Sequence, residues 1–199
     1  MTKPIFLASE NSAAMRLLGN AGITVDVMAA DLDDRALEEP LEETGASPED
    51  FALVLAEAKA TEMSGRYPGL LFLGCEQVWS LDDEILHAPA DMEEARRRLL
   101  LLSGKTHHVT VAVVLARDGE VLWRRTDVAG ITMLTLDPGF IGRYMAAIGV
   151  GGLQTANLCR IDGAGVQLVE TIEGDVFTAA GVPMLPLLAE LRRIGTVDF

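Results

Sequence analysis

The sequence predicts an α/β fold built on a mixed sheet with helices packed against it. Apolar segments with strand character alternate with amphipathic helical segments along the chain. Segment 69–78 has a continuous apolar body, which is typical of a strand buried on both faces. Asp118-Gly119 separates two β-rich segments and is a strong signal for an antiparallel hairpin. The sheet should therefore combine buried strands with antiparallel pairs.

The N-terminal half should begin with a strand, a short polar loop and a helix. The apolar run at 4–8 gives way to the polar residues 9–12, and the next segment has helical periodicity. A long helix is expected at 49–66, where Ser47 and Pro48 form a helix start. The apolar residues expected near one stripe of that helix are Phe51, Val54, Leu55, Ala58 and Met63. The remaining elements expected here are a strand at 23–29, an acidic arm or short helix within 31–50, and a strand at 69–78, whose end at 74–78 is also interpreted as the loop after the buried apolar body.

The C-terminal half should contain the hairpin and three more helices. Asp91 and Glu94 are placed as the cap and capping-box residues of one helix. The elements expected are a helix at 91–102, strands at 107–116 and 120–136, a helix at 137–148, short strands and turns within 158–173, and a helix at 184–194. Adjacent His107 and His108 should face opposite sides of a strand, so both are interpreted as structural. Asp175 is interpreted as a turn or helix-capping residue.

Composition and charge narrow the classes of function. The chain has 199 residues, of which 49% are hydrophobic and 23% are charged, so it suits one large domain or two fused lobes. A net charge of −14 argues against a nucleic-acid-binding protein and against adhesion to an anionic membrane. An anionic small ligand would need a local cluster of cations or a metal ion.

Cysteine use and hydropathy predict a cytoplasmic protein. The two cysteines, Cys75 and Cys159, have no metal-binding spacing and fit a reducing compartment. No apolar run approaches the roughly 18 residues that span a bilayer, and no signal-peptide pattern is expected at the N-terminus.

Four features predict a site for a phosphorylated ligand. The strand, polar loop and helix start at 4–18 is a common way to present backbone N–H groups to a phosphate. Glu76 follows a buried strand, where α/β sheets place ligands, although it could be a solvated acid. Lys59 is a suitable point charge for phosphate, although it could be a surface lysine whose stem is buried. Asp34 could share Mg²⁺ with Glu76 or be one of many acids in 31–50.

The order of these motifs resembles that of a known family. The opening Leu7-Ala8-Ser9, the later Lys59-Ala60 pair and the Gly74-x-Glu76-Gln77 segment are similar to motifs of the Maf family of nucleoside triphosphate pyrophosphatases. Three closing segments also match, namely Ile161–Gly165, Ile172–Asp175 and Gly181–Pro183. The resemblance extends from Ile5 to about Gly195.

The resemblance implies a fold and an activity. It implies one Maf-like domain over residues 1–199, with an elongated central sheet, a two-lobed Maf/ITPase-like architecture and a central cleft. It implies hydrolysis of a nucleoside triphosphate, either a standard or a non-standard one, to a monophosphate and pyrophosphate with Mg²⁺ or Mn²⁺. It further implies a possible homodimer, with no nucleic-acid or membrane partner.

The resemblance also implies roles for individual residues. Glu76 and Lys59 would be catalytic, and Asp34 and Glu76 would hold the metal ion. The residues implied to contact the nucleotide are Ser9, Asn11, Lys59, Gln77 and Asp162.

Several substitutions leave an alternative open. Ala13 and Ala14 stand where the family has two arginines, Ala88 stands where it has a lysine, and Glu76 replaces an aspartate. Arginine-type stabilisation can contribute about 10³ to 10⁵ in rate to phosphoryl transfer. The chain could therefore be a catalytically degenerate relative that binds a nucleotide or a protein partner, or an enzyme whose substrate carries less negative charge.

Overall fold

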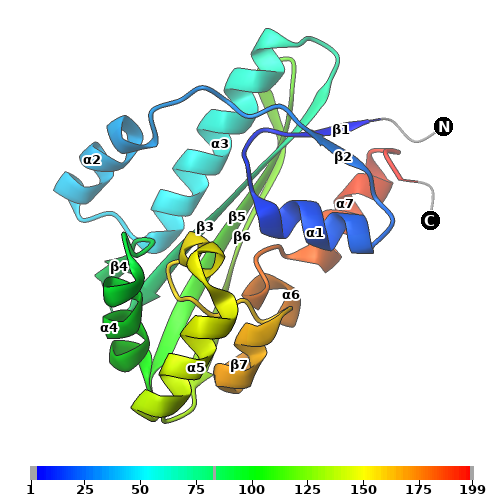
Figure 1. Cartoon of the computed structure of the whole chain (residues 1–199). Helices are drawn as coiled ribbons and strands as arrows, with labels where there is room; N and C mark the ends of the chain where they lie inside the picture. The colour runs from blue at the N-terminus through cyan, green and yellow to red at the C-terminus, as the bar shows by residue number, and fades with distance from the viewer. Residues whose placement is uncertain (1–3, 83, 198–199) are drawn as a thin grey trace. The chain divides into compact units, whose positions relative to one another are not determined.

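A computed structural model describes residues 4–82 and 84–197 of the chain (Figure 1). Hydrogen bonds join the strands in the order β2-β1-β3-β5-β6-β7, and β4 pairs with β3. The strands are β1 (Ile5–Leu7), β2 (Val25–Val27), β3 (Leu71–Leu81), β4 (Glu84–Leu86), β5 (Thr106–Arg117), β6 (Glu120–Met133) and β7 (Val169–Glu173). The helices are α1 (Ser12–Asn20), α2 (Asp34–Thr44), α3 (Pro48–Arg66), α4 (Met92–Leu102), α5 (Pro138–Ile148), α6 (Val176–Ala179) and α7 (Met184–Arg193), with two short 3-10 helices at Val150–Gln154 and Ala164–Leu168. The predicted mixed α/β class is confirmed.

The chain forms two compact units. The first unit comprises the chain up to residue 78, residues 110–127 and the chain from residue 181 onward. The second unit comprises residues 79–109 and 128–180. Among the described residues, no helix is long and apolar enough to cross a membrane.

In the first unit, β1 lies between two parallel neighbours. Ile5 pairs with Val25 of β2 and with Leu71 of β3, and Leu7 pairs with Leu73. The β1 side chains Ile5 and Leu7 are buried, as expected for a strand with neighbours on both sides. Because β1 ends at Leu7 while β3 continues to Leu81, the second half of β3 extends past the end of its neighbour.

That extension corrects one sequence prediction. The strand expected at 69–78 is confirmed, but the interpretation of 74–78 as a loop after it is wrong, because these residues are part of β3. The helix at 49–66 is confirmed. Its predicted stripe is confirmed at Phe51, Leu55 and Met63 and wrong at the other two positions, because Val54 is exposed and Ala58 is only partly buried. The residues buried on α3 are Phe51, Ala52, Leu55, Ala56, Lys59, Ala60, Met63 and Ser64.

The close approach of α3 to β3 depends on a glycine. A Cβ atom on Gly74 would lie only 2.1 Å from the carbonyl oxygen of Ala56, so no side chain fits at this position of β3. The hairpin between β5 and β6 turns at Asp118-Gly119 as predicted, with positive φ at both residues. Its turn contacts α3, since the Gly119 N–H donates to Ser64 Oγ at 3.1 Å.

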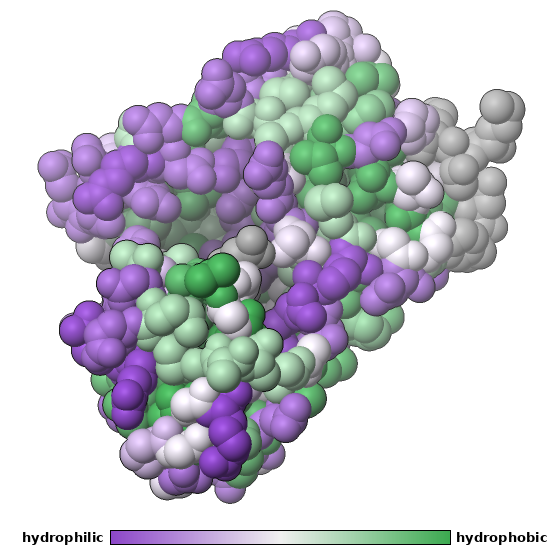
Figure 2. Space-filling view, in the orientation of Figure 1, coloured by the Kyte–Doolittle hydropathy of each residue, from purple (hydrophilic) through white to green (hydrophobic). Residues whose placement is uncertain are grey.

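The acidic segment at 31–50 contains the exposed helix α2. None of its side chains is buried, and the hydrophilic surface over α2 is visible in Figure 2. Asp33 caps its N-terminus by accepting from the Arg35 N–H, and Asp34 is the first helical residue. The strand expected at 23–29 is shorter than predicted, since β2 covers only Val25–Val27.

In the second unit, α4 and α5 pack against each other (Figure 1). The predicted caps are confirmed, since Asp91 accepts from the Glu94 N–H and Asp175 accepts from the Thr178 N–H. His107 is buried and His108 is exposed, so the two side chains face opposite sides of β5 as predicted. The strand β4, the short helix α6 and the 3-10 helices were not predicted.

Candidate functional site

The ammonium group of Lys59 lies between two carboxylates in the first unit. Lys59 Nζ is 2.9 Å from Asp34 Oδ2 and 3.1 Å from Glu76 Oε1. The Lys59 side chain is 9% exposed and that of Glu76 is 18% exposed, whereas that of Asp34 is 49% exposed. Three of the residues predicted to bind metal or phosphate therefore meet, and the alternative of a surface lysine is excluded.

The backbone of two packed elements brings Lys59 to Glu76. Lys59 follows Ala56 by three residues, so both lie on the buried stripe of α3. Glu76 follows Gly74 by two residues, so both side-chain positions point to the same face of β3. Because the carbonyl of Ala56 fills the space at Gly74, the next turn of α3 brings Lys59 alongside Glu76.

Burial and charge act against each other on this pair. Burial raises the pKa of Glu76, and the attraction of the Lys59 ammonium offsets only part of that effect. Burial alone would lower the pKa of Lys59, but the attraction of Glu76 and the hydrogen bonds to both carboxylates raise it above its ordinary value. Lys59 is therefore charged, and Glu76 is a stronger proton acceptor than an exposed glutamate.

The polar loop after β1 is attached to the same part of β3. Asn11 Nδ2 donates to the carbonyl oxygen of Cys75 at 2.9 Å, and Ser9 Oγ donates to the same oxygen at 3.3 Å. Asn11 Oδ1 accepts from the Ala14 N–H and so caps α1. The loop predicted to contact phosphate thus starts a helix next to Glu76, and the first-turn N–H groups other than that of Ala14 could donate to a phosphate.

Gln77 is also hydrogen-bonded to Asn11. Its Nε2 donates to Asn11 Oδ1 at 3.3 Å. The same side chain fills the space at Gly181, where a Cβ atom would lie 2.6 Å from Gln77 Nε2 and 2.9 Å from the Ala13 Cβ atom. Cys75 and Gly181 were not predicted as part of the site. Cys75 contributes through its backbone carbonyl, which no side-chain motif reveals.

The two alanines in place of arginines are packed rather than open. Ala13 is 8% exposed and Ala14 is fully buried. Two other positions that the family resemblance singled out belong to the second unit. Ala88 is exposed there, and Asp162 forms an ion pair with Arg160. The nucleotide contact predicted for Asp162 stays a prediction.

The two carboxylates that contact Lys59 could be ligands of a hard divalent cation. Carboxylate oxygens of Asp34 and Glu76 already share one positive charge, that of Lys59. Among the described residues, no group of three or more His, Cys, Asp or Glu side chains could hold a metal ion. Mg²⁺ commonly binds through one or two carboxylates together with substrate phosphates and water, so this pair fits such a cation.

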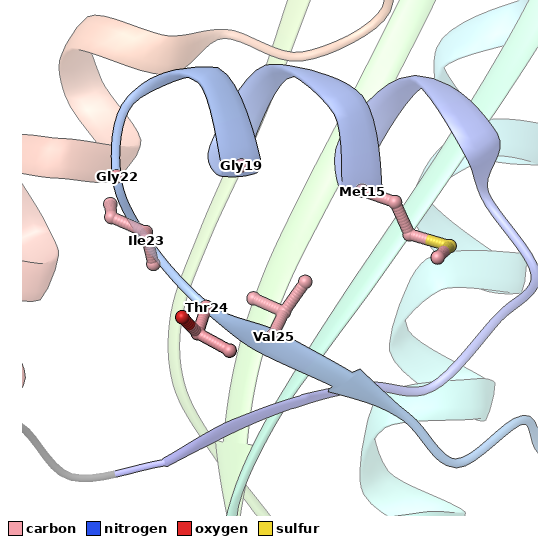
Figure 3. A pocket seen from close by; sticks show the side chains of 6 residues that line it. All are labelled: Met15, Gly19, Gly22, Ile23, Thr24 and Val25. Carbon is pink, nitrogen blue, oxygen red and sulfur yellow. The ribbon is translucent and has the colours of Figure 1, made fainter.

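A separate pocket lies at the other end of α1 (Figure 3). It has a volume of about 300 Å³ and is lined by Met15, Gly19, Gly22, Ile23, Thr24 and Val25. None of these six residues is charged, so this pocket lacks the groups needed to bind a triphosphate.

Comparison with known proteins identifies the family. The family model described as Maf-like protein matches residues 4–194. A protein named 7-methyl-GTP pyrophosphatase from Mesorhizobium japonicum is 58% identical over 100% of both chains. A protein of the same name from Brucella abortus is 52% identical to this chain, also over 100% of both chains.

A solved structure named nucleoside-triphosphatase, dITP/XTP pyrophosphatase, from Mycobacterium abscessus is 19% identical, with a TM-score of 0.43 over 96% of this chain and 93% of that chain. The assignment depends on the family match and on the full-length relatives, which confirm the resemblance seen in the sequence. This chain belongs to the Maf family.

Proposed function

We propose that this protein is a nucleoside triphosphate pyrophosphatase that converts 7-methyl-GTP to 7-methyl-GMP and pyrophosphate. The predicted class of enzyme, a hydrolase of acid anhydrides, is confirmed, since full-length relatives up to 58% identical are named pyrophosphatases. The single observation in the structure that carries the proposal is the buried Lys59 between Asp34 and Glu76.

The identity of the base follows from the relatives' names and from charge. Methylation of guanine at N7 places a positive charge on the ring, so 7-methyl-GTP is less anionic than GTP. The protein has a net charge of −14, and the buried Ala13 and Ala14 supply no positive charge where the family has arginines. Electrostatic repulsion should therefore be weaker for 7-methyl-GTP than for GTP. These features favour the reading in which the missing arginines reflect a less anionic substrate over a catalytically degenerate relative.

The roles of the residues follow from their chemistry. Glu76 would accept a proton from the attacking water as the oxygen bonds to the α-phosphorus. The bond to the β-phosphate oxygen would break, and pyrophosphate would leave. Lys59 would donate hydrogen bonds to phosphate oxygens, and the first-turn N–H groups of α1 beside Ser9 and Asn11 would hold others.

Asp34 and Glu76 would hold a divalent cation. Mg²⁺ or Mn²⁺, when bound, would neutralise charge on the phosphates. Gln77 would keep Asn11 in its capping orientation.

The proposal is tested by pyrophosphate release from 7-methyl-GTP, GTP and other nucleoside triphosphates with Mg²⁺ or Mn²⁺. We expect the highest kcat/KM for 7-methyl-GTP and a decrease of about 10²- to 10⁴-fold in Glu76→Gln, because the proton acceptor is lost. Glu57→Gln is the matched control. Glu57 of α3 pairs with Arg124 of β6, so this substitution should leave activity unchanged. If no nucleotide releases pyrophosphate, the proposed enzymatic activity is refuted. If kcat/KM is higher for GTP than for 7-methyl-GTP, the proposed preference for the methylated base is refuted.

We also propose a cytoplasmic location and a homodimer. Both cysteines are unpaired and buried, which fits a reducing compartment. The homodimer is proposed from the family resemblance, and light scattering on the purified protein tests it.

A further inference from the structure

The ammonium of Lys59 has the position that a cation shared by Asp34 and Glu76 would take. Its nitrogen contacts one oxygen of each carboxylate, at 2.9 Å and 3.1 Å. The three side chains together carry a net charge of −1 when both acids are ionised. The lysine stem is buried on α3, so the ammonium reaches the two acids from the protein side.

A divalent cation and this ammonium compete for the same oxygens. Mg²⁺ binds oxygen at about 2.1 Å and demands a near-octahedral arrangement of ligands. An ammonium in contact with the same two oxygens would lie within a few ångströms of the metal ion, where two positive charges repel each other. A metal ion that binds these same two oxygens, Asp34 Oδ2 and Glu76 Oε1, therefore requires Lys59 Nζ to leave at least one of them.

We infer that Lys59 acts as an internal counter-ion that a divalent cation displaces, and that the released ammonium then binds the substrate phosphates. The half-exposed Asp34 gives the entering cation access from solvent, while Glu76 is more deeply buried. The inference rests on the proposed function, because the phosphates supply the new partner of Lys59. Metal alone should then bind weakly, and metal and nucleotide should strengthen each other's binding by the same factor.

The test measures Mn²⁺ binding to the nucleotide-free protein by the EPR signal of free Mn²⁺. Lys59→Met removes the competing charge while keeping an apolar stem. We expect it to bind Mn²⁺ about 5- to 100-fold more tightly than the wild type, in the usual range of coupling between sites. Lys59→Arg keeps the charge and should show no such gain. Lys105→Met, which removes an exposed lysine in the second unit, should match the wild type.

A double variant localises the gain. In Lys59→Met with Asp34→Asn one of the two carboxylates is lost, so the tighter Mn²⁺ binding should disappear. The melting temperature of Lys59→Met should also rise more with Mn²⁺ than that of the wild type, since a ligand stabilises the folded state that binds it. If Lys59→Met does not fold, Lys59→Gln takes its place in both measurements.

Two results would overturn the inference. Lys59→Met could bind Mn²⁺ no more tightly than the wild type, or the gain could persist in the double variant and so come from elsewhere. Neither result depends on turnover. A wild type that releases pyrophosphate while showing either result would keep the proposed function, whereas a wild type without turnover would refute the function and leave the Mn²⁺ comparison valid.

Discussion

Gly74 of β3 faces the carbonyl oxygen of Ala56 in α3 so closely that a Cβ atom would lie 2.1 Å from it. Backbone atoms, rather than a flexible side chain, occupy the space. The distance between helix and strand is therefore set at one point, and the Lys59–Glu76 pair lies one turn of the helix beyond it.

Gly74→Ala should destabilise the protein and separate Lys59 from Glu76. Because the nearest atom belongs to the backbone, α3 or β3 has to shift, and overpacking of this kind costs about 1–3 kcal/mol. Urea unfolding measures the free energy, and kcat measures the effect on the site. Gly65→Ala on the same helix is the control, since its Cβ atom would meet only an ordinary contact at 3.8 Å, and a helical alanine is favoured over glycine. Equal stability of both variants would contradict the packing argument.

Asn11→Ala should weaken both the fold and the nucleotide site. It removes the cap of α1, at a cost of about 1 kcal/mol, and it removes the shorter of the two hydrogen bonds that join the loop to the Cys75 carbonyl. We expect a higher KM for 7-methyl-GTP as well as a lower melting temperature. Asp91→Ala removes the cap of α4 in the second unit and should lower stability by a similar amount without changing KM. An unchanged KM in Asn11→Ala would show that the loop does not hold substrate.

Ala14→Arg should not recover the arginine of the family motif. Ala14 is fully buried, so a guanidinium there would be desolvated and overpacked, at a cost of at least about 2 kcal/mol. Thermal unfolding monitored by circular dichroism provides the measurement. Met15→Arg introduces the same side chain at the neighbouring position of α1, where Met15 is 45% exposed, and should be tolerated. An Ala14→Arg protein as stable as the wild type would mean that this turn has room for the arginine.

Because the buried His107 is neutral in the folded protein, the free energy of unfolding should decrease in mild acid. Asn157 Oδ1 accepts from the Cys159 N–H, so Asn157 Nδ2 donates to His107 Nε2, and the imidazole is neutral. Burial lowers the pKa of His107 to about 4, with a smaller contribution from His108. The unfolded chain binds a proton near pH 6.5, so stability falls as pH decreases from about 6.5 to 4, by about 3 kcal/mol in total.

The measurement is the free energy of unfolding in urea between pH 4 and 7.5. His107→Asn should lose most of this acid-dependent decrease, whatever its stability at neutral pH. His108→Gln changes the exposed histidine and should keep the decrease. A decrease of the same size in His107→Asn would assign the effect to other groups.

Much of the fold and part of the site could be predicted from the sequence. Local signals were sufficient for the helix at 49–66, the turn at Asp118-Gly119 and the caps at Asp91 and Asp175, because each depends on residues close together in the chain. Glu76 and Asp34 were predicted as candidate metal ligands from the order of the family motifs.

The tertiary structure decided what these residues do together. The sequence by itself determined the α/β class, the family and the identity of Lys59, Asp34 and Glu76 as candidates. It did not determine that Lys59 lies on the buried stripe of α3, because that position depends on the packing of α3 against Gly74 of β3. The contact of one ammonium with two carboxylates joins residues up to 42 positions apart, from Asp34 to Glu76, and only the folded chain brings them together.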